Sequence, residues 1–414
     1  MNNRHCLYMI AAVVLCHSGF ADVLDRSGGV KIGERMTLRP AVALSLTYDS
    51  NVHSGHGDSD SDGDCLWSIS PAANLAYDAE TWSLLLSGYY NYRSYFKSEN
   101  KDSNHHSFGE DLRWNWSNAS GTEKGWSMVL GQSYKQITYC DDLVMDNGGH
   151  RYSGDTRQFQ FSGALQRRLN EFWHGDVNAD YYWLDYMDGG KNAARYYGWD
   201  RWRVGMEVGF APSRWTDFII SGAYQGYSQD NTAGSKISAN STGYHLQGGI
   251  GSYMTDRISY RLLAGISHFD YGEGASDSDG FVYTASANWK IGETWNTMLL
   301  GSSYYQPSER QRSSKSRVDA ISWGLAKVMV RGKLRATFDI RYRRETNEHI
   351  STSSYDYVIN VVTGRLGLNY SLNRFLSAYA HIEYQRCWND EAERRNYAYD
   401  YDRYRATIGL MLSY

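Results

Sequence analysis

Apolar and polar residues alternate with a period of two along most of the chain. In residues 38–48 the large apolar side chains fall on even positions, while Arg, Ala, Ser and Thr fall on odd positions. Residues 202–210, 334–342 and 376–384 repeat this alternation. A period of two predicts β-strands with two unlike faces. The alternating segments run to about 10–14 residues, the length of a tilted transmembrane strand, whereas ordinary soluble strands are shorter.

Eighteen strands of this kind are expected, joined by connectors of alternating length. Tight turns are expected at residues 78–80, 169–171, 212–214, 292–293 and 330–332, with long polar connectors such as 49–64 and 139–155 between them. This alternation is typical of an outer-membrane barrel with short periplasmic turns and long extracellular loops. The expected strands are 36–48, 65–77, 81–95, 104–116, 126–138, 156–168, 172–185, 197–211, 215–227, 240–254, 258–271, 280–291, 294–305, 317–329, 333–343, 355–370, 375–385 and 401–414.

Composition agrees with a single all-β transmembrane antiparallel barrel. The chain holds 35 Tyr and 14 Trp but only 4 Pro, and its mean hydropathy is −0.59. Many expected strands carry an aromatic residue at one or both ends of the apolar face, as at Trp82 and Tyr92 or Trp295 and Tyr305. Aromatic girdles at the two membrane interfaces have this placement. A soluble β-sandwich is the alternative, but so many long strands would be unusual there.

The N-terminus predicts export. Arg4 precedes a short apolar run from Leu7 to Cys16, and Gly19 and Ala21 form a small-residue cleavage pattern, which together are typical of a secretory signal. We therefore expect a signal peptide at 1–21, a periplasmic lead-in at 22–35, either a stub or a plug of the lower pore, and a transmembrane barrel at 36–414. Bulky Leu15 argues against a lipid anchor at Cys16.

The C-terminal strand resembles the signal read by the barrel-assembly machinery, which would be a partner during biogenesis. Thr407, Gly409, Leu412 and Tyr414 match its pattern of a polar residue, a glycine, an apolar residue and a final aromatic residue. The expected location is the outer membrane, with its lipids around the barrel.

Residues 38–52 read LRPAVALSLTYDSNV. A proline-led alternating strand that runs into Tyr-Asp-Ser-Asn-Val resembles the first strand of the second β-barrel porin family, some of whose members resemble outer-membrane components of exopolysaccharide export. The eighteen expected strands and the aromatic C-terminus extend this resemblance over nearly the whole mature chain. The resemblance implies a role in exopolysaccharide export as one alternative, and an export barrel would use separate periplasmic polysaccharide-export proteins as partners. It identifies no functional residues.

The alternation also predicts which side chains line the lumen. Arginines slightly outnumber acids among them, which favours weak anion preference or passage of an acidic polymer, unless the charges simply pair across strands. Tyrosines of the lumen could stack on sugar rings or could pack against the wall. The candidates are Tyr89, Arg93, Asp111, Arg113, Asp176, Asp180, Tyr182, Arg203, Glu207, Tyr304, Arg335, Asp339, Arg341, Tyr379, Glu383, Arg403 and Arg405.

Other chemistry is sparse. A formal net charge of −4 gives no basic excess for nucleic-acid binding, and no metal or cofactor site is expected. The alternating acids from Asp58 to Asp64 fit a solvated acidic loop better than a Ca²⁺ site, because no bidentate Glu follows. Outside the signal, Cys65, Cys140 and Cys387 allow one disulfide or free thiols.

A passive conduit is therefore the expected function, either a diffusion channel for small polar solutes or an export barrel. An adhesive or structural barrel is the alternative, and an outer-membrane hydrolase is a weaker one. No serine stands in a spacing that singles out a nucleophile beside His105, His106, His268 or His381. We therefore expect no enzyme. Glu110 stands on the apolar face between Phe108 and Leu112, with an expected place near the outer interface, and the sequence offers no functional account of it.

Overall fold

A computed structural model describes residues 29–50, 63–97, 104–118, 125–137, 155–186, 198–213, 215–229, 240–252, 257–271, 277–307, 314–349, 357–389 and 401–414. Within these ranges every regular element is a β-strand, and no helix is long and apolar enough to cross a membrane. The strands are β1 (Val30–Ile32), β2 (Met36–Asp49), β3 (Asp64–Asp78), β4 (Trp82–Tyr95), β5 (Asn104–Ser117), β6 (Gly125–Ile137), β7 (Thr156–Arg168), β8 (Trp173–Tyr186), β9 (Trp199–Ser213), β10 (Thr216–Gln229), β11 (Ser241–Gly251), β12 (Ile258–Asp270), β13 (Ser278–Ile291), β14 (Trp295–Pro307), β15 (Ser314–Met329), β16 (Leu334–His349), β17 (Tyr357–Ser371), β18 (Leu376–Asn389) and β19 (Tyr401–Ser413).

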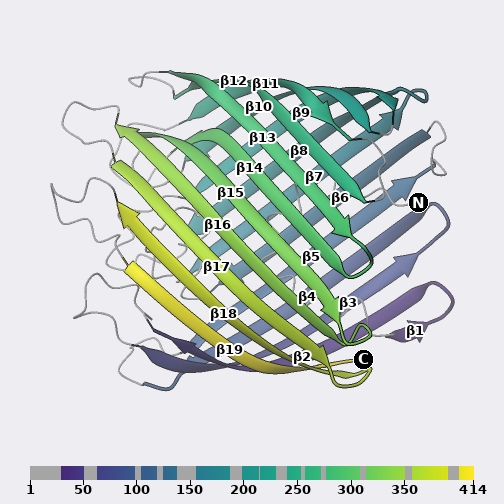
Figure 1. The fold of residues 1–414 in the computed structure, drawn as a ribbon, viewed down its shortest axis with the longest axis vertical. Coiled ribbons are helices and arrows are strands. Elements are labelled where there is room, and N and C mark those ends of the chain that lie inside the picture. The colour runs from purple at the N-terminus through teal and green to yellow at the C-terminus, as the bar shows by residue number, and fades with distance from the viewer. Residues whose placement is uncertain are drawn as a thin grey trace.

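Strands β2 to β19 close into one antiparallel barrel. Each pairs with its neighbour in sequence, and β19 returns to pair with β2, so the prediction of eighteen barrel strands is confirmed. Figure 1 shows the tilted strands with their tight turns gathered at one end of the barrel, here called the short-turn end. The opposite end carries the longer connectors, such as the one between β2 and β3.

The seam between β2 and β19 is completed by β1. Backbone pairing of the two barrel strands runs from Asp49 with Arg405 to Ala41 with Ser413. Below it the amide of Tyr414 donates to the carbonyl of Pro40, and the three residues of β1 then pair with Met36 to Leu38 of β2. The short strand β1 therefore continues the edge where β19 ends, at the short-turn end (Figure 1).

The outer face of the barrel is apolar. On β19, Ile408, Leu410 and Leu412 are 61%, 49% and 58% exposed, whereas the alternate residues Gly409 and Met411 face inward, and Met411 is 2% exposed. An exposed apolar surface of this size needs an apolar medium, whereas the inner face carries most of the polar and charged side chains. The side-chain alternation thus separates two environments, as the period of two in the sequence predicts.

Several strands run further towards the long-connector end than the sequence pattern predicts. β16 reaches His349 instead of residue 343, and β18 reaches Asn389 instead of residue 385. Residues 343–349 of β16 read RRETNEH, a stretch without an apolar residue. Period-two alternation marks a strand only where one face is apolar, so a segment that is polar on both sides gives no such signal.

Candidate functional site: the inner wall of the barrel

All the lumen-lining candidates lie on the face opposite the exposed apolar side chains. The cross-strand register places each beside other inward positions, for example Asp111 between Ser87 and Ser133, and Arg341 between Ser322 and Thr363. Arg93 pairs with Ser68 and His105, Arg113 with Leu85 and Gly131, and Arg335 with Val328 and Asn369. Whether these side chains line a path for a solute stays a prediction.

Five inward residues on five neighbouring strands form a row of alternating charge, here called the charge belt. Asp339 of β16 stands in register with Arg365 of β17, which stands in register with Glu383 of β18. Glu383 in turn pairs with Arg405 of β19, which pairs across the seam with Asp49 of β2. Opposite charges directly across an antiparallel ladder attract, because their Cβ atoms lie about 5 Å apart.

Side-chain contacts follow this register. Nε of Arg365 donates to Glu383, and Nη1 of Arg405 lies 3.9 Å from the other oxygen of Glu383. Nε of Arg405 also donates to Oδ2 of Asp49 at 3.0 Å. Glu383 and Arg405 thus each contact an oppositely charged side chain on both neighbouring strands. These contacts hold the charged groups against the inner wall.

Asp49 and Arg403 form a buried ion pair at the seam. Their side chains are 0% and 1% exposed. Nε of Arg403 donates to Oδ1 at 2.8 Å and to Oδ2 at 3.0 Å, and Nη2 also donates to Oδ2. Because a buried charge is tolerated only when it is paired and hydrogen-bonded, this contact ties the first barrel strand to the last.

Ion pairs of a second group lie on β8, β9 and β12. Nη2 of Arg201 donates to Asp180 at 2.9 Å, and Nη1 of Arg261 donates to Oε1 of Glu207 at 2.7 Å. Asp176 stands in register with Glu207 and accepts a hydrogen bond from Asn178 at 3.0 Å. Arg203 pairs with Asp180 along the same ladder, and its Nη2 lies 3.5 Å from Nε2 of His245.

Strands β13 to β15 are different, since their central inward positions carry no charge. Ladder neighbours here are Ser286 with Leu300, Leu300 with Ser322, and Ser302 with Thr284 and Ala320. These six residues are here called the neutral wall, which adjoins β16 of the charge belt.

Two of the candidate tyrosines lie across a glycine of the neighbouring strand. A Cβ atom built on Gly109 would stand 2.7 Å from the Tyr89 ring, and one built on Gly409 would stand 2.4 Å from the Tyr379 ring. Only glycine leaves room for a ring at these positions. Tyr89 and Tyr379 therefore pack flat against the wall, whereas Tyr304 is 40% exposed.

An inward aromatic cluster gathers towards the long-connector end of β8 to β14. The Tyr182 ring lies 4.9 Å from Trp199, which lies 6.0 Å from Tyr227. Tyr227 lies 5.7 Å from Phe269, and Tyr305 packs against the cluster that these two residues form with Tyr271. Phe269 is fully buried, so this cluster stiffens the wall around the rings that remain partly exposed.

The residues of the expected assembly signal take part in the seam. The Thr407 and Thr47 hydroxyls are 2.7 Å apart, Leu412 faces outward, and the Tyr414 ring stacks on Phe375 with centroids 5.3 Å apart. Recognition by an assembly machinery stays a prediction.

The remaining candidate groups are scattered. Cys65 is a free thiol and Cys387 is buried, while Cys140 and the acids Asp58, Asp60 and Asp62 lie outside the described residues. Asp64 is structural, since it accepts the amides of Cys65 and Lys97. His106 lies 2.5 Å from the Tyr90 hydroxyl and His268 2.7 Å from Asp279. His105 packs edge-on against Tyr95, and His381 lies parallel to Tyr379.

Sequence reasoning missed important members of the inner wall. Asp49 falls in the expected connector 49–64, but it continues the inward odd positions 41–47 of β2. Arg365 lies in the least regular of the expected strands, where Gly364 interrupts the apolar face. Arg201 and Arg261 follow the same parity as their inward neighbours, so extending the alternation to the strand ends would have found them.

No family model and no curated protein matches the chain, so the family resemblance drawn from residues 38–52 gains no support there. Solved structures with a similar shape include the FrpB iron transporter of Neisseria meningitidis (F3-3 variant), at 11% identity and a TM-score of 0.46, over 89% of this chain and 63% of that one. The siderophore receptor PirA of Pseudomonas aeruginosa matches at 9% identity and a TM-score of 0.43, over 93% and 81%. The outer membrane protein OpdK of Pseudomonas aeruginosa matches at 10% identity and a TM-score of 0.45, over 91% and 99%. The chain thus spans under two thirds of the first of these, and at such identities and scores the likenesses carry no argument about function.

Proposed function

We propose that this protein is a passive conduit across the outer membrane. The observation that carries the proposal is a closed barrel of eighteen strands with an apolar outer face and a polar, charged inner wall. Barrels with sixteen to eighteen strands are wide enough to enclose an aqueous channel. The export signal expected at residues 1–21 and the C-terminal pattern support the outer membrane as the location, with its lipids and the assembly machinery as partners.

The cargo that fits this wall is a small polar solute or an acidic polysaccharide. Inward arginines outnumber inward acids on β16 to β19, where Arg335, Arg341, Arg343, Arg365, Arg403 and Arg405 stand beside Asp339, Glu345 and Glu383. Partly exposed tyrosines add flat faces with hydroxyl groups. An export role, suggested by the resemblance at residues 38–52, would require separate periplasmic export proteins as partners.

Conductance in planar bilayers tests the conduit directly. Purified barrel should give discrete steps with a weak preference for anions. Conductance no greater than that of protein-free bilayers would refute the proposal and leave an adhesive or structural barrel, or the less favoured hydrolase, as the alternatives.

Deletion of the gene separates the two kinds of cargo. An export barrel should lose cell-surface polysaccharide on deletion and regain it with the wild-type gene. A diffusion channel should instead slow the uptake of small polar solutes and leave surface polysaccharide unchanged.

A further inference from the structure

One region of the outer face breaks the apolar pattern. Glu110, half-way along β5, points outward between the ladder neighbours Gly88 of β4 and Tyr134 of β6. Gln132 of β6 also points outward, in register with Leu112. No described residue forms a hydrogen bond or ion pair with Glu110, so within this part of the chain its carboxylate has no partner.

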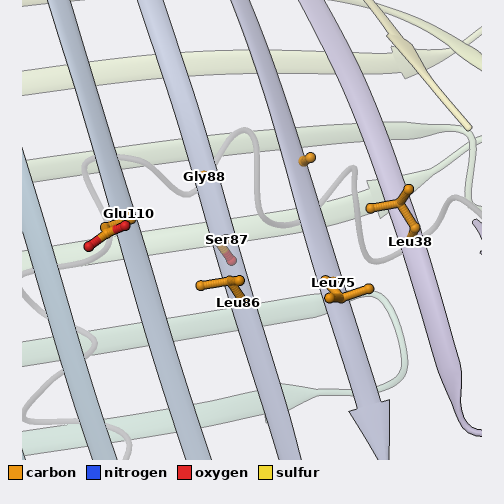
Figure 2. Close-up of a pocket in the computed structure, with 7 residues that line it drawn as sticks. Leu38, Leu75, Leu86, Ser87, Gly88 and Glu110 are labelled. Carbon is orange, nitrogen blue, oxygen red and sulfur yellow. The ribbon is translucent and has the colours of Figure 1, made fainter.

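The side chains beside Glu110 are small. Ala73 of β3 and Gly88 of β4 are ladder neighbours, and with Leu38, Leu75, Leu86 and Glu110 they line a shallow depression of about 330 Å³. Figure 2 shows the leucines around the rim of this depression and the Glu110 carboxylate at one side of it. Glu110, Gln132, Gly88 and Ala73 are here called the Glu110 patch.

Glu110 and Gln132 lie at nearly the same depth. Strand β6 extends further towards the short-turn end than β5, since β5 ends at Ser117, which pairs with Ser127, while β6 begins at Gly125. An in-register partner on the next strand therefore lies further from the short-turn end. Gln132 lies two residues nearer to the short-turn end than Tyr134, the partner of Glu110. This shift along β6 offsets the difference in depth between Glu110 and Tyr134.

The rest of the outer face offers a contrast. At the central outward positions of β10, β11 and β12 stand Ile220, Leu246 and Ile266, which are 65%, 53% and 62% exposed. These side chains suit lipid tails. A carboxylate and an amide at mid-strand do not, because polar groups without hydrogen-bond partners are unfavourable in hydrocarbon.

We propose that the Glu110 patch is the contact surface for a second copy of this chain. A two-fold axis along the membrane normal keeps both barrels in the same orientation and makes the contact self-complementary. It brings Glu110 of each barrel against Gln132 of the other, where the amide N–H donates to the carboxylate. Small residues at Ala73 and Gly88 allow close approach, as they do in other membrane interfaces, and the depression receives an apolar side chain of the partner.

Cross-linking in the outer membrane tests this proposal. In a background with Cys65, Cys140 and Cys387 replaced by Ser, Leu112→Cys places a thiol in register with Gln132 and two residues from Glu110 on β5. Leu246→Cys is the matched control on β11. With a short bismaleimide, Leu112→Cys should give a product of twice the chain mass and Leu246→Cys should not.

A second variant ties that product to the polar contact. Adding Glu110→Leu and Gln132→Leu should reduce the Leu112→Cys product at least tenfold, while the heat-dependent shift in gel mobility shows that the barrel still folds. Equal yields from Leu112→Cys and Leu246→Cys, or none from either, would mean that lipid covers the patch. A product of another mass would mean a different protein partner, and an unchanged yield after both leucine substitutions would mean that the polar pair does not hold the contact. Each of these results would overturn the proposal.

Discussion

The charge belt and the neutral wall are neighbours on the inner surface but differ in how they hold charge. In the belt, every charged member stands beside an opposite charge on the next strand. In the neutral wall, hydroxyl, methyl and isobutyl side chains share the ladder. A charge in the belt interacts mainly with the opposite charges beside it on the neighbouring strands. A charge placed on the neutral wall would have no such neighbour among these six residues and would interact with a solute in the lumen. The number of arginines therefore overstates the field that the belt presents to a solute.

The largest effect is expected at the seam end of the belt. Asp49→Ala leaves the buried Arg403 guanidinium without its carboxylate, and removal of one partner of a buried ion pair costs about 3–5 kcal/mol. The free energy of unfolding, measured by urea titration of the folded barrel with tryptophan fluorescence, should fall by this amount.

Two controls accompany Asp49→Ala. Asp319→Ala breaks the half-exposed pair with Arg317 and should cost about 1 kcal/mol or less. Adding Arg403→Met to Asp49→Ala should recover part of the loss, because the uncompensated charge is gone. A loss at Asp49 no larger than that at Asp319 would show that the seam does not depend on this pair.

The next largest effect is expected on ion selectivity, which compares the charge belt with the neutral wall. Ser302→Glu puts an acid on the neutral wall and should shift the permeability ratio towards cations on the order of twofold. Glu383→Gln removes an acid from the belt and should shift the ratio towards anions by less, because Arg365 and Arg405 each keep a second carboxylate neighbour. Reversal potentials across a salt gradient in planar bilayers measure both.

Ser302→Gln is the size-matched control for the first substitution and should leave the reversal potential unchanged. If Glu383→Gln shifted the ratio more than Ser302→Glu did, the belt would be acting on the solute and not chiefly on itself.

The smallest effect is expected at the second group of ion pairs. The Arg201 and Asp180 side chains are 32% and 18% exposed, and the Arg201 guanidinium also donates a hydrogen bond to the Tyr227 hydroxyl. Asp180→Asn should therefore lower the free energy of unfolding by about 1 kcal/mol or less, in the same urea titration. A loss as large as that of Asp49→Ala would mean that the two groups of ion pairs are equivalent.

The barrel itself could be predicted because its physical cause is visible in the sequence. A strand between lipid and an inner wall must alternate, and a tight turn must interrupt the alternation at one end only. The prediction of the strand ends fails where the strand no longer has one apolar face. β16 continues through residues 343–349, all of which are polar or charged in the sequence, and no alternation marks its end.

The inner wall was only half predictable. Parity assigned each candidate to a face, but no pattern along one strand shows which charges meet, since contacts such as Asp49 with Arg405 depend on register and closure. Likewise, the flat packing of Tyr379 depends on Gly409 across the ladder. Glu110 is visible in the sequence as an exception to the alternation, yet the small residues beside it, Ala73 and Gly88, belong to two other strands.

The seam has a consequence for how the protein is made. The hydroxyls of Thr47 and Thr407 meet although 360 residues separate them, so the first barrel strand has no final partner until the last one has been synthesised and exported. Pairing over such a separation is slow, because the entropy of closing the intervening chain is lost before contacts between the two strands compensate for it. Throughout that interval the edge of β2 is an open template for other strands, and its protection must come from factors outside the chain.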